Sequence, residues 1–179
     1  MTAIPIQFGE VSQLCNPPLS INGNFVKFGL CTMESDKFIT VCEKTNDAGV
    51  IAIVDLLNGG TISRQSISAE AAIMNPVSKV LALRSGEQLQ IFNLDLRAKM
   101  KAYTMPSPVV YWRWVSPNTI VLVTSTSVYH WSIEGSTDPV KLFDRNAALG
   151  PESKAQIINY KLSGDGKWCL LCGISAGEG

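Results

Sequence analysis

The sequence predicts an all-β protein built from repeated antiparallel sheets, on three observations. Short apolar runs bounded by turn residues recur along the chain, and no window shows the sustained i, i+3, i+4 apolar spacing of an amphipathic helix. Equivalent positions of these runs, at Lys37, Lys79, Thr119 and Lys167, are separated by 42, 40 and 48 residues. Each unit also contains strands joined by a polar turn. A period of about 40 to 50 residues made of short strands is typical of the four-stranded blades of a β-propeller.

The repeat predicts one propeller domain over residues 1–179, with units at residues 21–66, 67–107, 108–154 and an incomplete 155–179. The predicted strands are residues 38–42 and 50–54, 80–83 and 89–94, 120–124 and 128–132, and 168–172. Ahead of the first unit, Pro17 and Pro18 exclude a helix or the interior of a sheet. The last unit stops after one strand, and a sheet without its outer strands has an exposed edge. We therefore expect this chain to be the front part of a longer protein.

Composition excludes several functional classes. Hydrophobic residues make up 46% of the chain and charged residues 17%, which favours a packed domain over a disordered segment. Lys plus Arg and Asp plus Glu number 15 each, so no net charge attracts nucleic acid or anionic lipid. The 5 cysteines are scattered, and neither a secretory leader nor an apolar run of about 18 residues is seen. We expect a soluble cytoplasmic protein that binds no nucleic acid.

No motif for catalysis, metal binding or cofactor binding is found. Cys169 and Cys172 form a CxxC, but a zinc site needs about four ligands, which favours two packed thiols. His130, the single histidine, has no Ser, Cys or acid at a motif spacing, which favours a partly buried structural imidazole over a general base. The sequence therefore predicts no enzyme, no metal and no cofactor. A propeller-fold enzyme or small-molecule sensor that uses the central channel, with converging ionisable groups, is the alternative.

A candidate binding surface lies in the hairpin predicted at residues 80–94 and the segment after it. Because side chains alternate between the faces of a strand, Gln90 and Phe92 point to one face. Arg97 and Lys99 share one side of the following segment if it is extended. An aromatic ring, an amide and two cations suit a short extended peptide that carries apolar anchors and a carboxylate. The alternative is an ordinary strand with a solvated basic end.

Seven segments carry a resemblance to a known family: TMESDKFI (32–39), ISAEAAIMNPVSKV (67–80), LQIFNL (89–94), KMKA (99–102), VYHWS (128–132), PVKLFDR (139–145) and QIINY (156–160). They closely resemble the N-terminal terminal domain of the clathrin heavy chain family, over nearly the whole chain. The resemblance implies a seven-bladed propeller, truncated here after about three and a half blades.

The same resemblance implies a cellular role. It implies a structural protein of coated pits and coated vesicles, at the plasma membrane and the trans-Golgi, that acts in endocytosis and vesicle-mediated intracellular protein transport. Association with membranes is then indirect, through endocytic adaptor and accessory proteins. Contacts with the clathrin light chain and within the heavy-chain trimer belong to regions absent from this chain. A non-functional truncated copy is a further alternative.

The resemblance also implies two peptide sites. The first is a groove between the first two blades for the leucine-rich acidic clathrin-box motifs of adaptors, lined by Leu81, Gln88, Gln90, Phe92, Arg97 and Lys99. Gln88 stands where threonine is typical of the family, and Arg97 stands where lysine is typical, which keeps the charge and adds a bidentate fork. The second site lies on the top face and suits a tryptophan-bearing motif, with Phe28, Gln156, Ile158 and Ile174. Near it the chain is longer than the family pattern, at residues 149–155.

Overall fold

The structure, a computed structural model, describes residues 6, 8–44, 49–135 and 138–175. The strands form four antiparallel sheets. The first sheet contains β1 (Cys31–Thr32), β2 (Phe38–Lys44), β3 (Gly49–Asp55) and β4 (Thr61–Gln65), and the second contains β5 (Ala71–Met74), β6 (Val80–Ser85), β7 (Gln88–Asn93) and β8 (Ala98–Thr104). The third sheet contains β9 (Val109–Ser116), β10 (Thr119–Thr124), β11 (Ser127–Ser132) and β12 (Val140–Asp144), and the fourth contains β13 (Gln156–Leu162) and β14 (Cys169–Ile174). In the described part of the chain the helices are the 3-10 turns η1 (Gly23–Phe25), η2 (Ala147–Leu149) and η3 (Pro151–Ser153). None of them is long and apolar enough to span a membrane.

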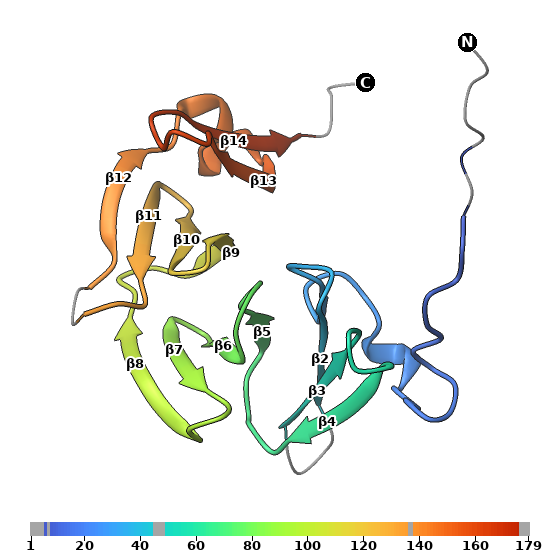
Figure 1. The fold of residues 1–179 in the computed structure, drawn as a ribbon. Helices are drawn as coiled ribbons and strands as arrows, with labels where there is room; N and C mark the ends of the chain where they lie inside the picture. The colour runs from blue at the N-terminus through green and yellow to red at the C-terminus, as the bar shows by residue number, and fades with distance from the viewer. Residues whose placement is uncertain (1–5, 7, 45–48, 136–137, 176–179) are drawn as a thin grey trace.

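The four sheets follow one another around an arc (Figure 1). Strands adjacent in sequence are adjacent in each sheet, so every sheet is a meander. In the second and third sheets β5 and β9 lie on the inner side of the arc, and β8 and β12 lie on the outer side. This is the blade arrangement of a β-propeller, and it confirms the predicted all-β propeller class.

Packing between sheets explains why the middle strands are continuous apolar runs. In β6, Leu81 and Leu83 pack with the first sheet in a cluster that contains Phe38. Val80 and Ala82 pack with the third sheet. Both faces of the strand are buried, so the alternation of polar and apolar residues that marks a half-exposed strand is lost.

The predicted strands coincide with observed ones. Segments 38–42, 50–54, 80–83, 120–124 and 128–132 lie inside β2, β3, β6, β10 and β11, and segments 89–94 and 168–172 overlap β7 and β14 with shifted ends. The remaining strands were expected only as parts of each unit. Outer strands such as β8 and β12 are mostly exposed, so their sequences have no strong apolar pattern.

Residues 14–26 cover the free face of the first sheet. Leu19 and Ile21 are buried there in a cluster with residues of β2 and β3. The Nη2 atom of Arg64 in β4 donates a hydrogen bond to the carbonyl oxygen of Leu19 at 2.9 Å. Pro17 and Pro18 lie in turns, outside helix and sheet, as predicted. One end of the arc is therefore covered by the chain itself.

Polar side chains also connect neighbouring sheets. The hydroxyl of Thr32 donates to the carbonyl oxygen of Ala72 at 2.9 Å, which joins the first and second sheets. The side-chain amide of Asn75 donates to the carbonyl oxygen of Pro117 at 2.6 Å, which joins the second and third. Asn75 is fully buried, and its Oδ1 accepts the backbone N–H groups of the turn that follows it. Its polar groups are satisfied, as a buried position requires.

Candidate functional site

The first candidate surface lies between the first and second sheets, where β7 and its flanking turns face β4 and the segment after it. Gln90 is opposite Leu83, and Phe92 is opposite Leu81, so both side chains share the face of β6 that packs with the first sheet. Phe92 is half-buried against that cluster. Leu81 is fully buried, so it packs beside Phe92 and presents no surface of its own.

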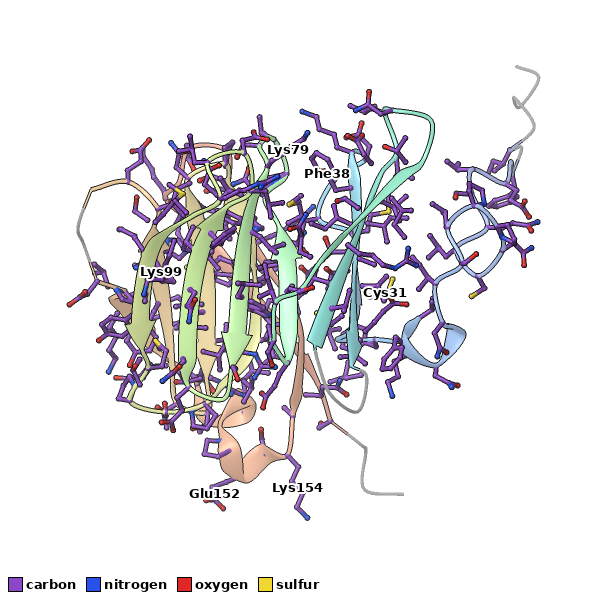
Figure 2. All side chains as sticks on the ribbon, turned by 90° about the horizontal axis from the view of Figure 1, so that it is seen from below. Cys31, Phe38, Lys79, Lys99, Glu152 and Lys154 are labelled. Carbon is purple, nitrogen blue, oxygen red and sulfur yellow. The ribbon has the colours of Figure 1, made fainter. Side chains whose placement is uncertain are left out.

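Lys99 lies opposite Phe92 across β7 and β8. A register shift between Ile91 and Phe92 places one extra residue in β8, so that Ile91 is opposite Lys101. Lys101 consequently faces the third sheet, where its Nζ donates to the carbonyl oxygen of Ser132 at 2.7 Å. Lys99 is exposed, on the same face as Phe92, and Figure 2 shows it on the outer strand.

Arg97 lies before β8, in a turn. The expectation that Arg97 and Lys99 share one side of an extended segment is therefore wrong. Arg97 is the last residue of the turn at 94–97 and has a φ of 50°, in the left-handed region. Short hairpin connections often need one residue in this conformation to reverse the chain. The turn is held by a hydrogen bond from the backbone N–H of Leu96 to Oδ1 of Asn93 at 2.9 Å. Arg97 is therefore exposed at the end of the hairpin, out of line with Lys99.

Two separate cavities lie between the first and second sheets at this surface. Gln88 and Gln90 line one of about 40 Å³, together with residues 67–69. A second, of about 270 Å³, is lined by residues that include Phe38, Lys79 and Asp95. Figure 2 shows Phe38 and Lys79 at the same end of the sheets. Sequence reasoning missed this larger cavity because its lining residues come from two sheets that only the fold brings together.

The second candidate surface is a cavity of about 370 Å³ with lining residues from all four sheets, among them residues of the inner strands β1, β5 and β9. Phe28, which is 84% exposed, and Ile158, which is 43% exposed, both line it. Gln156 and Ile174 lie opposite each other at one end of the β13–β14 sheet, outside this lining. The structure therefore brings two of the four predicted residues into one cavity and places the other two beside it.

This cavity contains an ion pair that sequence reasoning did not assign. Oε2 of Glu34 accepts a hydrogen bond from the backbone N–H of Trp114 at 3.0 Å and lies 3.9 Å from Nε of Arg113. Arg113 donates from Nη1 to Oδ1 of Asn159 at 3.0 Å, so these contacts connect the first, third and fourth sheets. Burial raises the pKa of Glu34, although the N–H of Trp114 and the charge of Arg113 oppose the shift.

Arg84, on β6, also lines the cavity. No short sequence motif indicates these contacts of Glu34, because its hydrogen-bond donor Trp114 is 80 residues away in sequence and Arg113 is the residue before Trp114.

The segment at residues 149–155, where the chain is longer than the family pattern, packs against β14 through Leu149. Cδ2 of Leu149 is 2.8 Å from the position that a Cβ on Gly173 would occupy, so the absence of a side chain at Gly173 admits the segment. Lys154 ends η3 with a left-handed φ of 52°. Figure 2 shows Glu152 and Lys154 projecting at the end of the molecule opposite Lys79. The extra residues add exposed charge near the second surface without lining its cavity.

His130 has a structural environment. Its Nε2 is 3.0 Å from the hydroxyl of Tyr160, which links the third and fourth sheets, and burial lowers the pKa of the imidazole. This agrees with the predicted partly buried structural role.

The cysteines are all free thiols. Cys172 is partly buried, but Cys169 is exposed, so the expectation of two packed thiols is wrong for Cys169. The reason is that β14 has a single strand neighbour among the described residues. Within the described ranges, no group of three or more His, Cys, Asp or Glu is placed to hold a metal ion.

Comparisons with known proteins point in one direction. No protein-family model matches the chain. The chain is 50% identical over 173 residues to the clathrin heavy chain of Drosophila melanogaster and 49% identical over 173 residues to clathrin heavy chain 2 of Homo sapiens. Each match covers 97% of this chain and 10% of the relative, so the chain spans about a tenth of the length of these relatives. Among solved structures, the Cps50 (Swd1) β-propeller domain of Myceliophteria thermophila superposes with a TM-score of 0.56 at 12% identity, over 85% of this chain and 51% of that one, which supports the propeller fold alone.

Proposed function

This chain belongs to the clathrin heavy chain family, and we therefore propose that it forms part of a non-enzymatic vesicle coat protein whose propeller grooves bind short adaptor peptides. The observation that carries the proposal is the match of 97% of the chain to clathrin heavy chains at 49% to 50% identity. The units at residues 21–66, 67–107, 108–154 and 155–179 are the proposed blades. The first groove then lies between the first and second blades.

In the first groove, the proposed ligand is an extended peptide with spaced leucines and a neighbouring acidic residue. The half-buried ring of Phe92 offers an apolar wall for a leucine side chain. Burying one such side chain contributes about 1.5 to 3 kcal/mol before the cost of ordering the peptide. The amide of Gln90 can both donate to and accept from the backbone of an extended peptide.

Charge gives this ligand a direction along the groove. Lys99 stands on the groove face, and Arg97 stands at the end of the same hairpin, so both can attract the carboxylate of the peptide. Asp55 and Asp95 line the larger cavity and disfavour a second acidic residue there. Gln88 borders the smaller cavity and limits the size of the side chain that enters it.

At the second surface, the proposed ligand is a tryptophan-bearing peptide. Phe28 and Ile158 supply exposed apolar contact at the cavity, and Gln156 and Ile174 extend this surface along the end of the fourth sheet. A cavity of about 370 Å³ is within the size range of ligand sites, roughly 300 to 1,000 Å³.

The proposed cellular setting follows from the family. The protein works in the cytoplasm, on coated pits and coated vesicles at the plasma membrane and trans-Golgi, in endocytosis and vesicle-mediated protein transport. It reaches the membrane through adaptors and binds no nucleic acid. Light-chain binding and trimer formation belong to parts of the relatives that this chain does not span.

Peptide titration tests the proposal. A fluorescent peptide with three spaced leucines and one acidic residue is expected to bind the 179-residue chain with micromolar Kd, on the order of −7 kcal/mol. The matched control replaces the leucines by alanines and keeps the charge. Equal affinity for the two peptides, or no binding of either, would refute docking in the first groove.

A further inference from the structure

The cavity of the second surface continues past its apolar residues to a charged group. Its lining includes Phe28 and Ile158 and also Glu34, Arg84 and Arg113, so one cavity of about 370 Å³ joins an exposed aromatic ring to a partly buried carboxylate. We propose that a peptide at the second surface inserts a tryptophan side chain into this cavity and donates its indole N–H to the carboxylate of Glu34. The inference rests on the proposed peptide-binding function of the same surface, and it assigns recognition of the tryptophan side chain to Glu34.

Glu34 has an oxygen available for such a bond. Both of its polar contacts, with the backbone N–H of Trp114 and with Nε of Arg113, use Oε2. Oε1 makes no hydrogen bond with any residue that the structure describes, and the side chain is only 14% exposed. Burial raises the pKa of Glu34, as expected for a carboxylate that has lost part of its hydration. A donor from a ligand would replace that hydration, and hydrogen bonds to charged groups are stronger than neutral ones.

The other charges in the cavity select a neutral donor. Arg84 and Arg113 both line it, so a ligand cation such as a lysine ammonium would meet two like charges. An indole N–H is neutral, donates one hydrogen bond and accepts none, so it leaves no unsatisfied acceptor in the cavity. Its ring also has a large apolar surface that suits contact with Phe28 and Ile158.

Removal of the single N–H proton tests the proposal. One peptide carries tryptophan and a second carries 1-methyltryptophan at the same position. Both are titrated against the wild-type chain, Glu34→Gln, Glu34→Ala and Glu152→Gln, and circular dichroism checks that each variant folds. Glu34→Gln keeps an acceptor for the N–H of Trp114, which protects the fold if Glu34→Ala is unstable. Glu152→Gln is the matched control, because Glu152 is exposed on the adjacent segment and does not line the cavity.

The wild-type chain and Glu152→Gln are expected to bind the methylated peptide about tenfold or more weakly, the factor for a lost hydrogen bond to a charged group. The preference should shrink to a few-fold in Glu34→Gln and vanish in Glu34→Ala. An equal preference in every protein would overturn the role of Glu34, since the added methyl group alone would then explain it. If the tryptophan peptide does not bind the wild-type chain at all, the second surface fails as a peptide site, while binding of the leucine peptide still tests the first groove independently.

Discussion

Phe92 and Lys99 lie directly opposite each other across β7 and β8, on the face that looks toward the first sheet. Residues opposite one another in an antiparallel pair share a face and lie close together, so an aromatic ring and a cation lie side by side in the proposed groove. A leucine followed or preceded by an acid matches this pair. The first two predictions test the cations and the aromatic ring separately.

Charge reversal at the cations should weaken binding of the leucine peptide. Arg97→Glu combined with Lys99→Glu replaces attraction of the peptide's acid by repulsion, and we expect a loss of about tenfold or more. The loss should be larger at low ionic strength because exposed charges are screened by salt. The matched control is Lys161→Glu with Lys167→Glu, the same charge change at exposed positions of β13 and of the turn before β14. Equal losses in the two double variants would show only an effect of net charge.

Truncation of the aromatic ring should weaken the same peptide by a different mechanism. Phe92→Ala removes the apolar wall, and we expect a loss on the order of tenfold, with the salt dependence of binding unchanged. Titrations at two ionic strengths measure both quantities. An unchanged affinity in Phe92→Ala would place the leucine contact elsewhere.

Leu81→Ala should affect stability more strongly than Phe92→Ala does. Leu81 is fully buried between the first and second sheets, and such truncations typically cost about 2 to 5 kcal/mol of unfolding free energy. Phe92, directly opposite it in the register, is only half-buried, so its truncation should cost less than its full volume suggests. Urea denaturation of both variants measures the difference. A smaller cost for Leu81→Ala would contradict the packing described for β6.

Glu34→Gln should remove a pH-dependent part of the stability. Burial raises the folded-state pKa of Glu34 above its ordinary value, so the folded chain holds this proton more tightly than the unfolded chain does. The stabilising contribution is complete below the ordinary pKa and is lost as pH rises through the raised pKa. Glutamine does not titrate, so the unfolding free energy of the variant should rise relative to wild type across that window. Denaturant unfolding in steps from about pH 4 to pH 7 tests the sign, and a difference that falls with pH would reverse it.

The free face of the fourth sheet should make the 179-residue chain self-associate. Trp168, Leu170 and Ile174 are 77%, 60% and 56% exposed, and β14 has one strand partner among the described residues. Exposed apolar patches and open sheet edges promote association. We expect binding of a hydrophobic dye and an apparent mass that rises with concentration, both reduced by Leu170→Lys. A monodisperse monomer that binds no dye would refute this expectation.

Residues 80–94 show how far pattern reasoning reaches. Their strands and the common face of Gln90 and Phe92 follow from apolar runs and from a side-chain period of two, and the structure has both. The face of Lys99 did not follow in the same way. One extra residue in β8 places Lys99 opposite Phe92 and Lys101 opposite Ile91, so the two lysines lie on different faces of the sheet. Nothing in the strand sequence AKMKAYT predicts this bulge.

Sequence alone was sufficient for the propeller class and the positions of the middle strands, because the apolar runs and their recurrence every 40 to 48 residues can be read without the fold. It also indicated that His130 is partly buried, although its contact with Tyr160 comes from the tertiary structure. Tertiary structure was needed for the left-handed turn at Arg97, the exposure of Cys169 and the contact between Glu34 and Trp114. These depend on the turn that sets the hairpin, on which edge has one strand neighbour among the described residues, and on residues 80 positions apart that meet only when separate sheets pack against one another.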